Sequence, residues 1–300
     1  MTRDHASAPR LACLLLPVLL LAALPGQAAC PPEGHDRASL EALRAAGFQV
    51  APPQREALAS GLLDCLGDPD PGLRDGIAYE ALMSWMRAGA FDPPVLRRLR
   101  DRLQAMLGQE DPAGFRGPFA ALVLAEVART DRIRPWMSAQ ERSAMVAAAA
   151  AWLTGVDDYR GFVAGEGWRH GVAHGADWLM QLALNPAIEA RDADAILAAV
   201  ASQVIPAGGH AYVFGEPERL ARPLLFLGQR GLLSPGHLEA WLSARQAALQ
   251  PARPGDADWL AARHDLQAFL RVLYVETGAT TDPALARLHP VVAKALRPPG

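Results

Sequence analysis

The sequence predicts an all-α protein made of stacked helix hairpins, either a HEAT-like α-solenoid or an α/α toroid. Apolar residues recur at the helical spacing along nearly the whole chain, and the alternating pattern of β-strands is almost absent. Capping side chains and prolines separate the apolar segments in the way that they separate helices. Similar segments recur at intervals of about forty to fifty residues, which is typical of helical repeats.

The beginning of the chain has the pattern of a signal peptide. Arg3 and Arg10 supply positive charge, residues 11–24 form an apolar stretch, and Gly26 and Ala28 are the small residues that precede cleavage after Ala28. The apolar stretch is too short to cross a bilayer as a stable helix, so no transmembrane segment is expected. We therefore expect a periplasmic or secreted protein with a signal peptide at 1–28, an N-terminal segment at 29–36 and a single helical-repeat domain at 37–298.

Two cysteines remain after this cleavage, because Cys13 is lost with the signal peptide. In an oxidising compartment Cys30 and Cys65 are expected to form one disulfide, which ties the new N-terminus to an early helix. The alternative is a lipoprotein that carries its lipid on Cys30, and the two possibilities exclude each other. The residues before Cys30 fit a lipoprotein cleavage box poorly, because Gln27 stands where an apolar residue such as leucine is usual.

Local signals place the helix boundaries. Ser138 and Glu141 form a capping box. Asp92, Ser234 and Asp282 each put a capping side chain directly before a proline suited to the first helical turn. The expected helices span residues 37–47, 53–66, 72–88, 93–107, 116–130, 138–154, 168–184, 190–204, 217–230, 235–248, 258–275 and 283–296.

Regularly spaced arginines mark a weak internal repeat. Each opens a helix with an apolar stripe close behind, at Arg74, Arg116, Arg169, Arg219 and Arg263. Their spacing matches one helix pair with its turns, which is the period of HEAT-like repeats. The segment 68–75 also resembles the turn of a HEAT repeat, in which an aspartate caps the second helix.

The composition is that of an ordinary globular protein, with 51% hydrophobic and 20% charged residues and a net charge of -3. Lys294 is the only lysine, and no basic patch is dense enough to indicate nucleic acid as a partner. The sequence contains no nucleophile motif, phosphate-binding loop or dinucleotide fingerprint. Candidate chemistry therefore has to come from clusters of polar side chains.

The densest polar motif lies on the helix expected at 168–184. His170, His174 and Asp177 occupy positions i, i+4 and i+7 there, so they share a face opposite the apolar stripe of the same helix. Two imidazoles one turn apart can chelate a divalent metal such as zinc, with Asp177 as a third ligand. A groove for a non-metal ligand and a purely structural polar network are the alternatives.

A second polar cluster occupies the glycine-rich loop and helix start at 208–222. In a repeat fold this segment lies one unit from the histidine helix, so the two polar clusters are expected to meet at one rim. Glu216 alternatively only caps the next helix at its positive end. Trp168 offers a stacking surface for a sugar or an aromatic ligand, although tryptophans more often fill the core. The candidate ligand-binding residues of both clusters are Trp168, His170, His174, Asp177, His210, Tyr212, Glu216 and Arg219.

Several segments have a familiar pattern, namely residues 73–78, 115–119, 158–162, 167–177 and 215–219. Together they resemble the bacterial family catalogued as domain of unknown function 2785, over roughly residues 35–245. The run from Trp168 to Asp177 is its most specific part. The resemblance implies a helical domain with this run at its functional centre, and it implies no activity, substrate or cofactor.

Two functions are compatible with these residues. The leading hypothesis is an exported helical-repeat protein that binds a small ligand or a protein partner in a polar groove, which is lined by the 168–184 helix and the 208–222 loop. The alternative is a metal-dependent hydrolase that uses His170, His174 and Asp177 as zinc ligands. The metal content of the purified protein separates the two.

Overall fold

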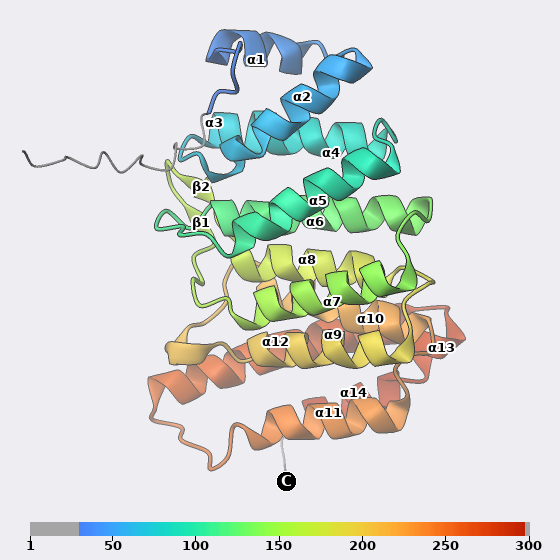
Figure 1. Cartoon of the computed structure of the whole chain (residues 1–300). Helices are drawn as coiled ribbons and strands as arrows, with labels where there is room; N and C mark the ends of the chain where they lie inside the picture. Colours follow the sequence, from blue (N-terminus) through green and yellow to red (C-terminus); the bar gives the residue numbers. More distant parts are fainter. Residues whose placement is uncertain (1–29, 298–300) are drawn as a thin grey trace, which may run out of the picture.

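The computed structural model describes residues 30–297, so the expected signal peptide and its cleavage site lie outside the described residues (Figure 1). Helices form nearly all of the regular structure in this range, which confirms the predicted all-α class. A π-helical turn (Arg74–Tyr79) joins α3 to α4, and an antiparallel hairpin of β1 (Phe162–Val163) and β2 (Gly167–Trp168) lies between α7 and α8. The α-helices are α1 (Arg37–Ala45), α2 (Pro52–Leu62), α3 (Pro71–Leu73), α4 (Glu80–Arg87), α5 (Pro93–Leu107), α6 (Arg116–Ile133), α7 (Ala139–Thr154), α8 (Gly171–Ala183), α9 (Ala190–Gln203), α10 (Glu216–Gln229), α11 (Pro235–Ala247), α12 (Ala257–Ala279), α13 (Pro283–Ala286) and α14 (His289–Leu296).

The helices pack in two rows, and the packing follows the order of the chain. Helices α4, α6, α8, α10 and α12 pack against one another in succession and form the first row. In the second row α5 packs on α6, α7 on α8 and α9 on α10, with α11 beyond them. In Figure 1 α1 and α2 lie at one end of the stack and α11 and α14 at the other. This arrangement favours an open solenoid over a closed toroid.

The predicted repeat coincides with the first row. Its arginines lie on first-row helices or at the entrance to them: Arg74 begins the turn before α4, Arg116 begins α6, Arg169 precedes α8, and Arg219 and Arg263 lie within α10 and α12. Each spacing therefore covers one first-row helix and the second-row helix that follows it. The period of the arginines is the length of one helix pair.

Local capping explains why most helix starts were predicted well. The Asp92 side chain accepts the backbone N–H of Val95 at 3.0 Å, and α5 begins at Pro93 as expected. Ser138 and Glu141 form the predicted reciprocal capping box at the start of α7. Ser234 and Asp282 likewise cap α11 and α13 through their side chains. These contacts involve residues within three positions of one another, so the sequence alone specifies them.

Several helix boundaries differ from the prediction. The helix expected over 53–66 ends at Leu62 and is followed by a 3-10 turn, and the helix expected over 258–275 ends at Ala279. The helix expected from residue 168 begins at Gly171, because residues 167–168 pair in the hairpin and His170 adopts a left-handed conformation with φ 56°. The helix expected over 283–296 is divided into α13 and α14. Pro290 lies in the first turn of α14, where it supplies no N–H and disfavours a continuous helix through the residue before it.

A disulfide joins Cys30, the first described residue, to Cys65 in the 3-10 turn that follows α2. Cys30 and Cys65 are bonded, with their Cα atoms 5.1 Å apart. Cys65 is buried, and Pro32 packs so closely on α2 that a Cβ on Gly61 would lie 2.7 Å from the Pro32 Cβ. The predicted pairing is therefore present, and a Cys30 in this bond has no free sulfur to carry a lipid.

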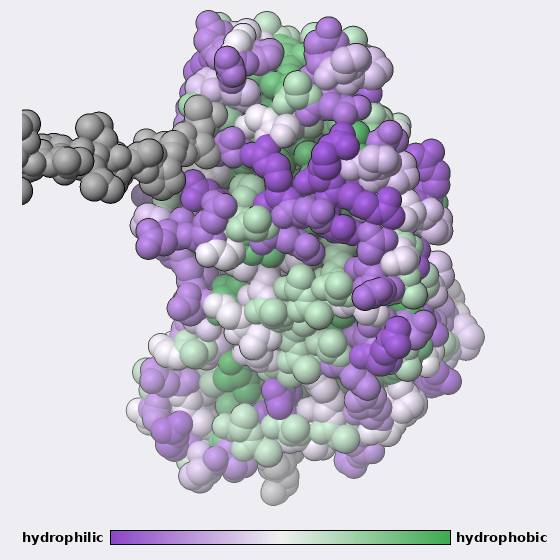
Figure 2. Space-filling model, viewed as in Figure 1, coloured by the Kyte–Doolittle hydropathy of each residue, from purple (hydrophilic) through white to green (hydrophobic). Residues whose placement is uncertain are grey.

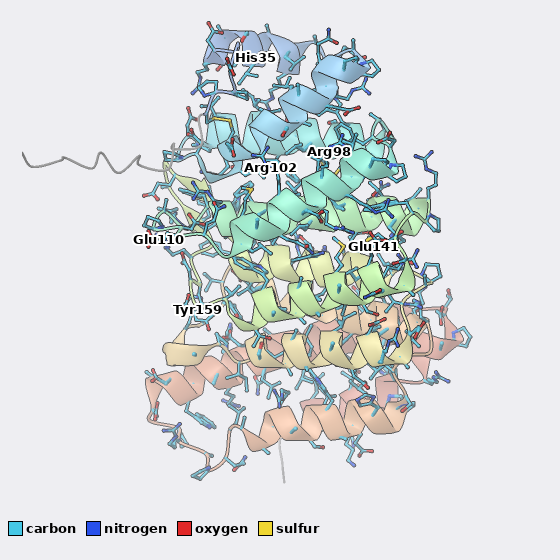
Figure 3. All side chains as sticks on the ribbon, viewed as in Figure 1. His35, Arg98, Arg102, Glu110, Glu141 and Tyr159 are labelled. Carbon is cyan, nitrogen blue, oxygen red and sulfur yellow. A yellow bond between two sulfur atoms is a disulfide. The ribbon has the colours of Figure 1, made fainter. Side chains whose placement is uncertain are left out.

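Ion pairs between neighbouring second-row helices cover one face of the molecule. Figure 2 shows a hydrophilic band across the upper half of this face, and Figure 3 places Arg98, Arg102 and Glu141 on it. Arg98 of α5 reaches Glu56 of α2 at 3.1 Å, and Arg102 reaches Asp64 at the same distance. On the other side of α5, Arg97 bonds Glu141 of α7 at 2.8 Å. The arginines of α5 thus bind the adjacent units through exposed pairs, each of which is worth little alone.

The hydrophobic core runs through the whole stack. Every helix from α1 to α14 contributes at least one buried apolar side chain, from Leu40 at one end to Val292 at the other. Within residues 30–297, no helix combines the length and the apolar character that crossing a membrane requires.

Removal of the disulfide should destabilise the protein by about 3–4 kcal/mol in the loop-entropy model, since the bonded residues are 35 positions apart. Urea unfolding with and without a reductant measures this difference. A variant with Cys30→Ser and Cys65→Ser should match the reduced protein and no longer respond to the reductant. Equal stability of the oxidised and reduced proteins would contradict the expectation.

Candidate functional site

The five segments that resemble a known family converge at one edge of the first row. This edge contains the π-helical turn before α4, the starts of α6, α8 and α10, and the hairpin between α7 and α8. These segments lie up to about 140 residues apart in the sequence and become neighbours because consecutive first-row helices pack side by side. The contacts among them define the candidate site.

Arg74 lies at the centre of this edge with none of its surface exposed. One guanidinium nitrogen, Nη1, donates to the carbonyl oxygen of Asp68 at 2.9 Å, and Nη2 donates to the carbonyl oxygen of Glu166 at 2.8 Å. Nε lies 2.6 Å from Asp75 Oδ1, which is close enough for an ion pair. The N–H of Nε does not point at this oxygen, so the two atoms form no hydrogen bond. Burial lowers the pKa of Arg74 from its ordinary value, and the charge of Asp75 opposes that change.

Two arginines enclose the ring of Phe115 at the start of α6. The guanidinium carbon of Arg74 lies 3.9 Å from the ring centroid and that of Arg169 lies 4.2 Å from it. Arg169 also donates to the Ala113 carbonyl at 2.7 Å and to the Glu166 carboxylate at 2.6 Å. Cation–π contacts and carbonyl acceptors together stabilise two like charges at close range.

The hairpin can approach Arg74 only because residue 167 is a glycine. Gly167 has φ 84°, and a Cβ built on it would lie 2.8 Å from Arg74 Nη2. Both the left-handed conformation and the lack of space disfavour any other residue. This contact fixes the position of β2 and of the residues that follow it.

His170 leaves the hairpin and caps the start of α8. Its left-handed backbone turns the imidazole towards α10, where Nε2 lies 3.3 Å from Glu216 Oε1. The ring stacks on Trp168, with centroids 4.7 Å apart. Burial would raise the pKa of Glu216, but its contact with His170 and the N–H of Phe214 hold that pKa below its usual value.

His174 is buried one turn further along α8. Its Nδ1 lies 3.2 Å from the Pro118 carbonyl of α6, and the edge of Phe119 packs on the ring with centroids 5.4 Å apart. Burial, with the neighbouring positive charges, lowers the pKa of His174 to about 3. The imidazole is therefore neutral at physiological pH, and Nδ1–H donates to the carbonyl oxygen.

Asp177 continues the same face of α8 and pairs with α10. Arg219 makes a direct ion pair with its Oδ2, and Arg222 lies 3.9 Å from its Oδ1. Burial raises the pKa of Asp177, and the two guanidinium groups act against that rise. The carboxylate joins α8 to α10 as the His174 contact joins α8 to α6.

The predicted zinc site receives no support from this geometry. His170 precedes α8, so the expected i, i+4, i+7 arrangement on one helix holds only for His174 and Asp177. The two imidazole centroids are 5.8 Å apart with tilted planes, and Asp177 is engaged by Arg219. Across the described part of the chain, no group of three His, Cys, Asp or Glu side chains is placed to hold a metal ion. Zinc binding stays a prediction.

The second polar cluster meets the first only in part. Glu216 and Arg219 reach His170 and Asp177 as expected. His210 instead stacks on Tyr159 with centroids 5.1 Å apart, and the buried Tyr212 donates its hydroxyl to Gln203 at 3.3 Å. The gap among Tyr159, His170, Tyr212 and Glu216 leaves no room for a water molecule. Side chains of the two clusters fill this gap, and ligand binding by the candidate residues stays a prediction.

An exposed apolar surface adjoins this closed network. Its members, which we call the rim surface, are Phe162 at 46% exposed, Trp168 at 38%, Val213 at 72% and Phe214 at 40%. The Trp168 centroid lies 5.2 Å from that of Phe162 and 5.7 Å from that of Phe214. Of these residues only Trp168 was predicted. The others lie outside the helices, Phe162 in β1 and Val213 and Phe214 in the loop before α10, so no helical pattern marked them.

The family profile described as "Protein of unknown function (DUF2785)" matches residues 103–275. The chain belongs to this family. The matched range starts in α5 and ends in α12, so it contains the hairpin, α8 and the start of α10. The resemblance seen in the sequence is confirmed, although the match excludes Arg74 and extends beyond residue 245. No curated protein and no solved structure matches the chain.

Acidification should destabilise the folded state through His174. Because its pKa is about 3 when folded and about 6.5 when unfolded, the unfolded chain binds an extra proton between these values, and stability falls as the pH is lowered through them. When the pH is lowered from 7 to 4.5, the free energy of unfolding measured in urea should fall by about 2–3 kcal/mol more in the wild type than in His174→Gln. The exposed His237→Gln serves as the control and should follow the wild type. An identical pH dependence in His174→Gln would contradict the assignment.

Replacement of Arg74 by lysine should cost about 3 kcal/mol of folding free energy, because an ammonium cannot reach both carbonyl groups and still stack on Phe115. The matched control is Arg98→Lys on exposed α5, for which a change within about 0.5 kcal/mol is expected. Urea unfolding at pH 7 measures both. A change below about 1 kcal/mol for Arg74→Lys would show that the edge does not depend on this guanidinium.

Proposed function

We propose that this chain is an exported protein that binds a protein partner through the rim surface of Phe162, Trp168, Val213 and Phe214. The observation that carries the proposal is the grouping of three exposed aromatic side chains, Phe162, Trp168 and Phe214, from the β1–β2 hairpin and the loop before α10. Val213, which is also exposed, is next to Phe214 in the chain. Contiguous apolar surface with a polar border is typical of protein interaction sites. Aromatic residues, phenylalanine among them, are enriched at the centre of such sites, and tryptophan is one of the residues that contribute most to binding there.

The rim surface is held in place before any partner arrives. Phe214 packs over Gly161 so closely that a Cβ on that glycine would lie 2.1 Å from the ring. Trp168 stacks on His170, and β2 is fixed by the Arg74–Glu166 contact. Little side-chain entropy is therefore lost when a partner binds, which favours affinity.

The closed network beside the rim surface supports a protein partner over a small ligand. Small ligands bind mainly in concave sites that enclose most of their surface. The space among His170, Tyr212 and Glu216 is filled, so a small molecule could contact these residues only from outside and would not be enclosed by them. A protein can instead cover the four apolar side chains together with bordering charges such as Arg160 and Glu218.

Export is supported by the bond between Cys30 and Cys65. Disulfides persist in oxidising compartments and are rare in the cytosol. The predicted signal peptide ends two residues before the first bonded cysteine, so the bond ties down the chain immediately after the cleavage site. We infer a periplasmic or secreted location on these grounds.

The metal-dependent hydrolase is the weaker alternative. Zinc bound by His170, His174 and Asp177 would require Asp177 to leave Arg219 and the His174 ring to turn from the Pro118 carbonyl. The first change would leave a guanidinium without its partner, which costs free energy in a partly buried position. No observation among the described residues favours this alternative.

A photoreactive amino acid at Val213 should form one discrete covalent adduct when the protein is illuminated in the cells that make it. The adduct is detected on a gel, and mass spectrometry identifies the bound protein. The same amino acid at Ile133, which is 61% exposed at the opposite end of α6, is the control for random contact. Phe162→Ser should abolish the Val213 adduct without lowering the melting temperature.

Two results would overturn the proposal. One is an adduct pattern at Val213 that equals the pattern at Ile133. The other is a specific adduct that survives Phe162→Ser and Trp168→Ser together, since binding would then not use the apolar surface.

A further inference from the structure

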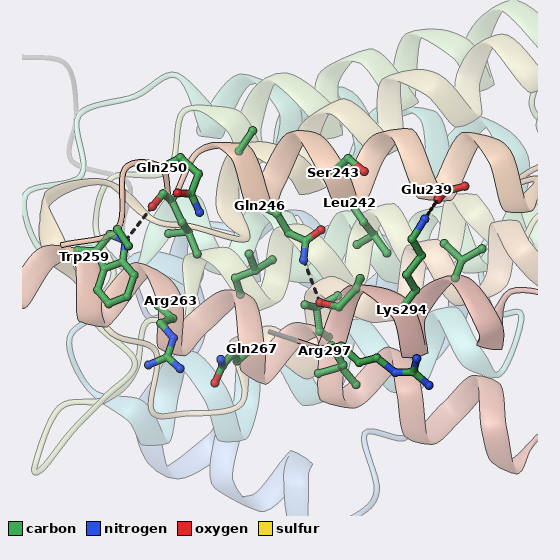
Figure 4. A pocket seen from close by; sticks show the side chains of 18 of the residues that line it. Glu239, Leu242, Ser243, Gln246, Gln250, Trp259, Arg263, Gln267, Lys294 and Arg297 are labelled. Carbon is green, nitrogen blue, oxygen red and sulfur yellow. Dashed lines mark hydrogen bonds and ion pairs between the residues drawn. The ribbon is translucent and has the colours of Figure 1, made fainter. Parts of the chain in front are cut away.

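A cavity of about 930 Å³ lies in the last helix hairpin, between α11, α12 and α14 (Figure 4). One face of α12 forms a wall, with Trp259, Arg263, Leu266 and Leu270 at helical spacing. Leu242 of α11 faces them from the other side. None of the rim-surface residues lines this cavity, so it is a second and separate feature of the fold.

The cavity exists because the last hairpin does not close. In the three preceding hairpins the second-row helix packs directly on its partner, as α5 on α6, α7 on α8 and α9 on α10. Helices α11 and α12 make no comparable contact, and α14 packs against both of them instead. The interior that a closed hairpin would fill with its own side chains is left open between the three helices.

The interior of the cavity is apolar. Leu242, Leu266 and Leu270 are almost fully buried at its base, whereas Leu260 on its wall remains 45% exposed. Leaving a leucine in water forgoes the stabilisation that burial would give. The volume lies within the range of about 300–1,000 Å³ that is typical of small-molecule sites.

The charged residues of the lining are unbalanced. Arg263, Lys294 and Arg297 are cationic, and Glu239 is the single carboxylate among the lining residues. Lys294 bonds Glu239 with Nζ 2.6 Å from Oε1. Over residues 30–297, Arg263 and Arg297 have no ion-pair partner. Figure 4 shows Arg263, Gln267 and Arg297 following one another along one edge of the cavity.

We propose that this cavity binds a fatty acid, with the acyl chain in the apolar interior and the carboxylate at the edge that carries Arg263 and Arg297. The leucines account for the chain, because burying methylene groups supplies free energy in proportion to their number. The acid group is received at this edge by Arg263 or Arg297, which lie on either side of Gln267, because guanidinium donors form charge-assisted hydrogen bonds with carboxylates. A simple inorganic anion would leave the apolar walls in water, and an uncharged alcohol would lack the charge-assisted hydrogen bond.

Isothermal titration of the purified protein with sodium dodecanoate, kept below its micelle concentration, tests this assignment. We expect one molecule bound per chain, and about tenfold weaker binding for dodecan-1-ol, which has the same chain without the charge. The double variant Arg263→Gln, Arg297→Gln should weaken dodecanoate binding about tenfold and leave dodecanol binding unchanged. Arg191→Gln, an exposed arginine on α9 away from the cavity, is the control and should change neither.

Steric variants test the location. Ala295→Trp places a large ring in the cavity and should abolish binding of both probes. Ser243→Trp at the exposed border serves the same purpose if the first variant does not fold. Unchanged binding in these variants, or equal affinity for dodecanoate and dodecanol, would overturn the proposal.

Two other occupants give different results. A second copy of the chain would produce a dimer in sedimentation that Ala295→Trp dissociates, with no binding of dodecanoate by the dimer. Residues 298–300 would act as an internal competitor, so a variant that ends at Arg297 would bind both dodecanoate and dodecanol more tightly than the full chain does. Either result would refute the fatty acid as the natural occupant.

Discussion

The buried guanidinium of Arg74 is the interaction on which the candidate site depends. It comes from the turn before α4, stacks on Phe115 at the start of α6, and donates to the carbonyl of Glu166 in the hairpin before α8. A charge removed from water is tolerated only while its partners stay in place, so three segments that are distant in the sequence are held in one arrangement. The exposure of Trp168 and the contact of His170 with Glu216 both follow from the position of that hairpin.

Most of the fold could be predicted because its helices are specified locally. Asp92, Ser138, Ser234 and Asp282 cap helices through contacts within three residues, and a sequence displays such signals directly. The start of α8 was misplaced because it is decided by contacts from elsewhere in the chain. Arg74, 92 residues before Glu166, holds the hairpin that displaces the helix start.

In the candidate site, too, the sequence specified the local arrangement but not the contacts with distant parts of the chain. The spacing of His174 and Asp177 correctly placed them on one face of α8, but it carried no information on what covers that face. Pro118 of α6 and Arg219 of α10 cover it, and they engage the two residues in contacts with the neighbouring helices. Buried polar groups that bond each other add rigidity and specify how adjacent repeats align. The exposed aromatic side chains lie beside this face in the β1–β2 hairpin and in the loop before α10, where Phe162 and Phe214 had no helical pattern to mark them.

The chain contains one lysine, and that residue stands at the mouth of the cavity in the last hairpin. Apart from the terminal amine, the side chain of Lys294 on α14 is therefore the only primary amine in the sequence. Its side chain is 76% exposed although it pairs with Glu239 of α11, so the amine is open to solvent while α11 and α14 remain together. Reagents and proteases specific for lysine thus act on the described stack at a single position, on its last helix.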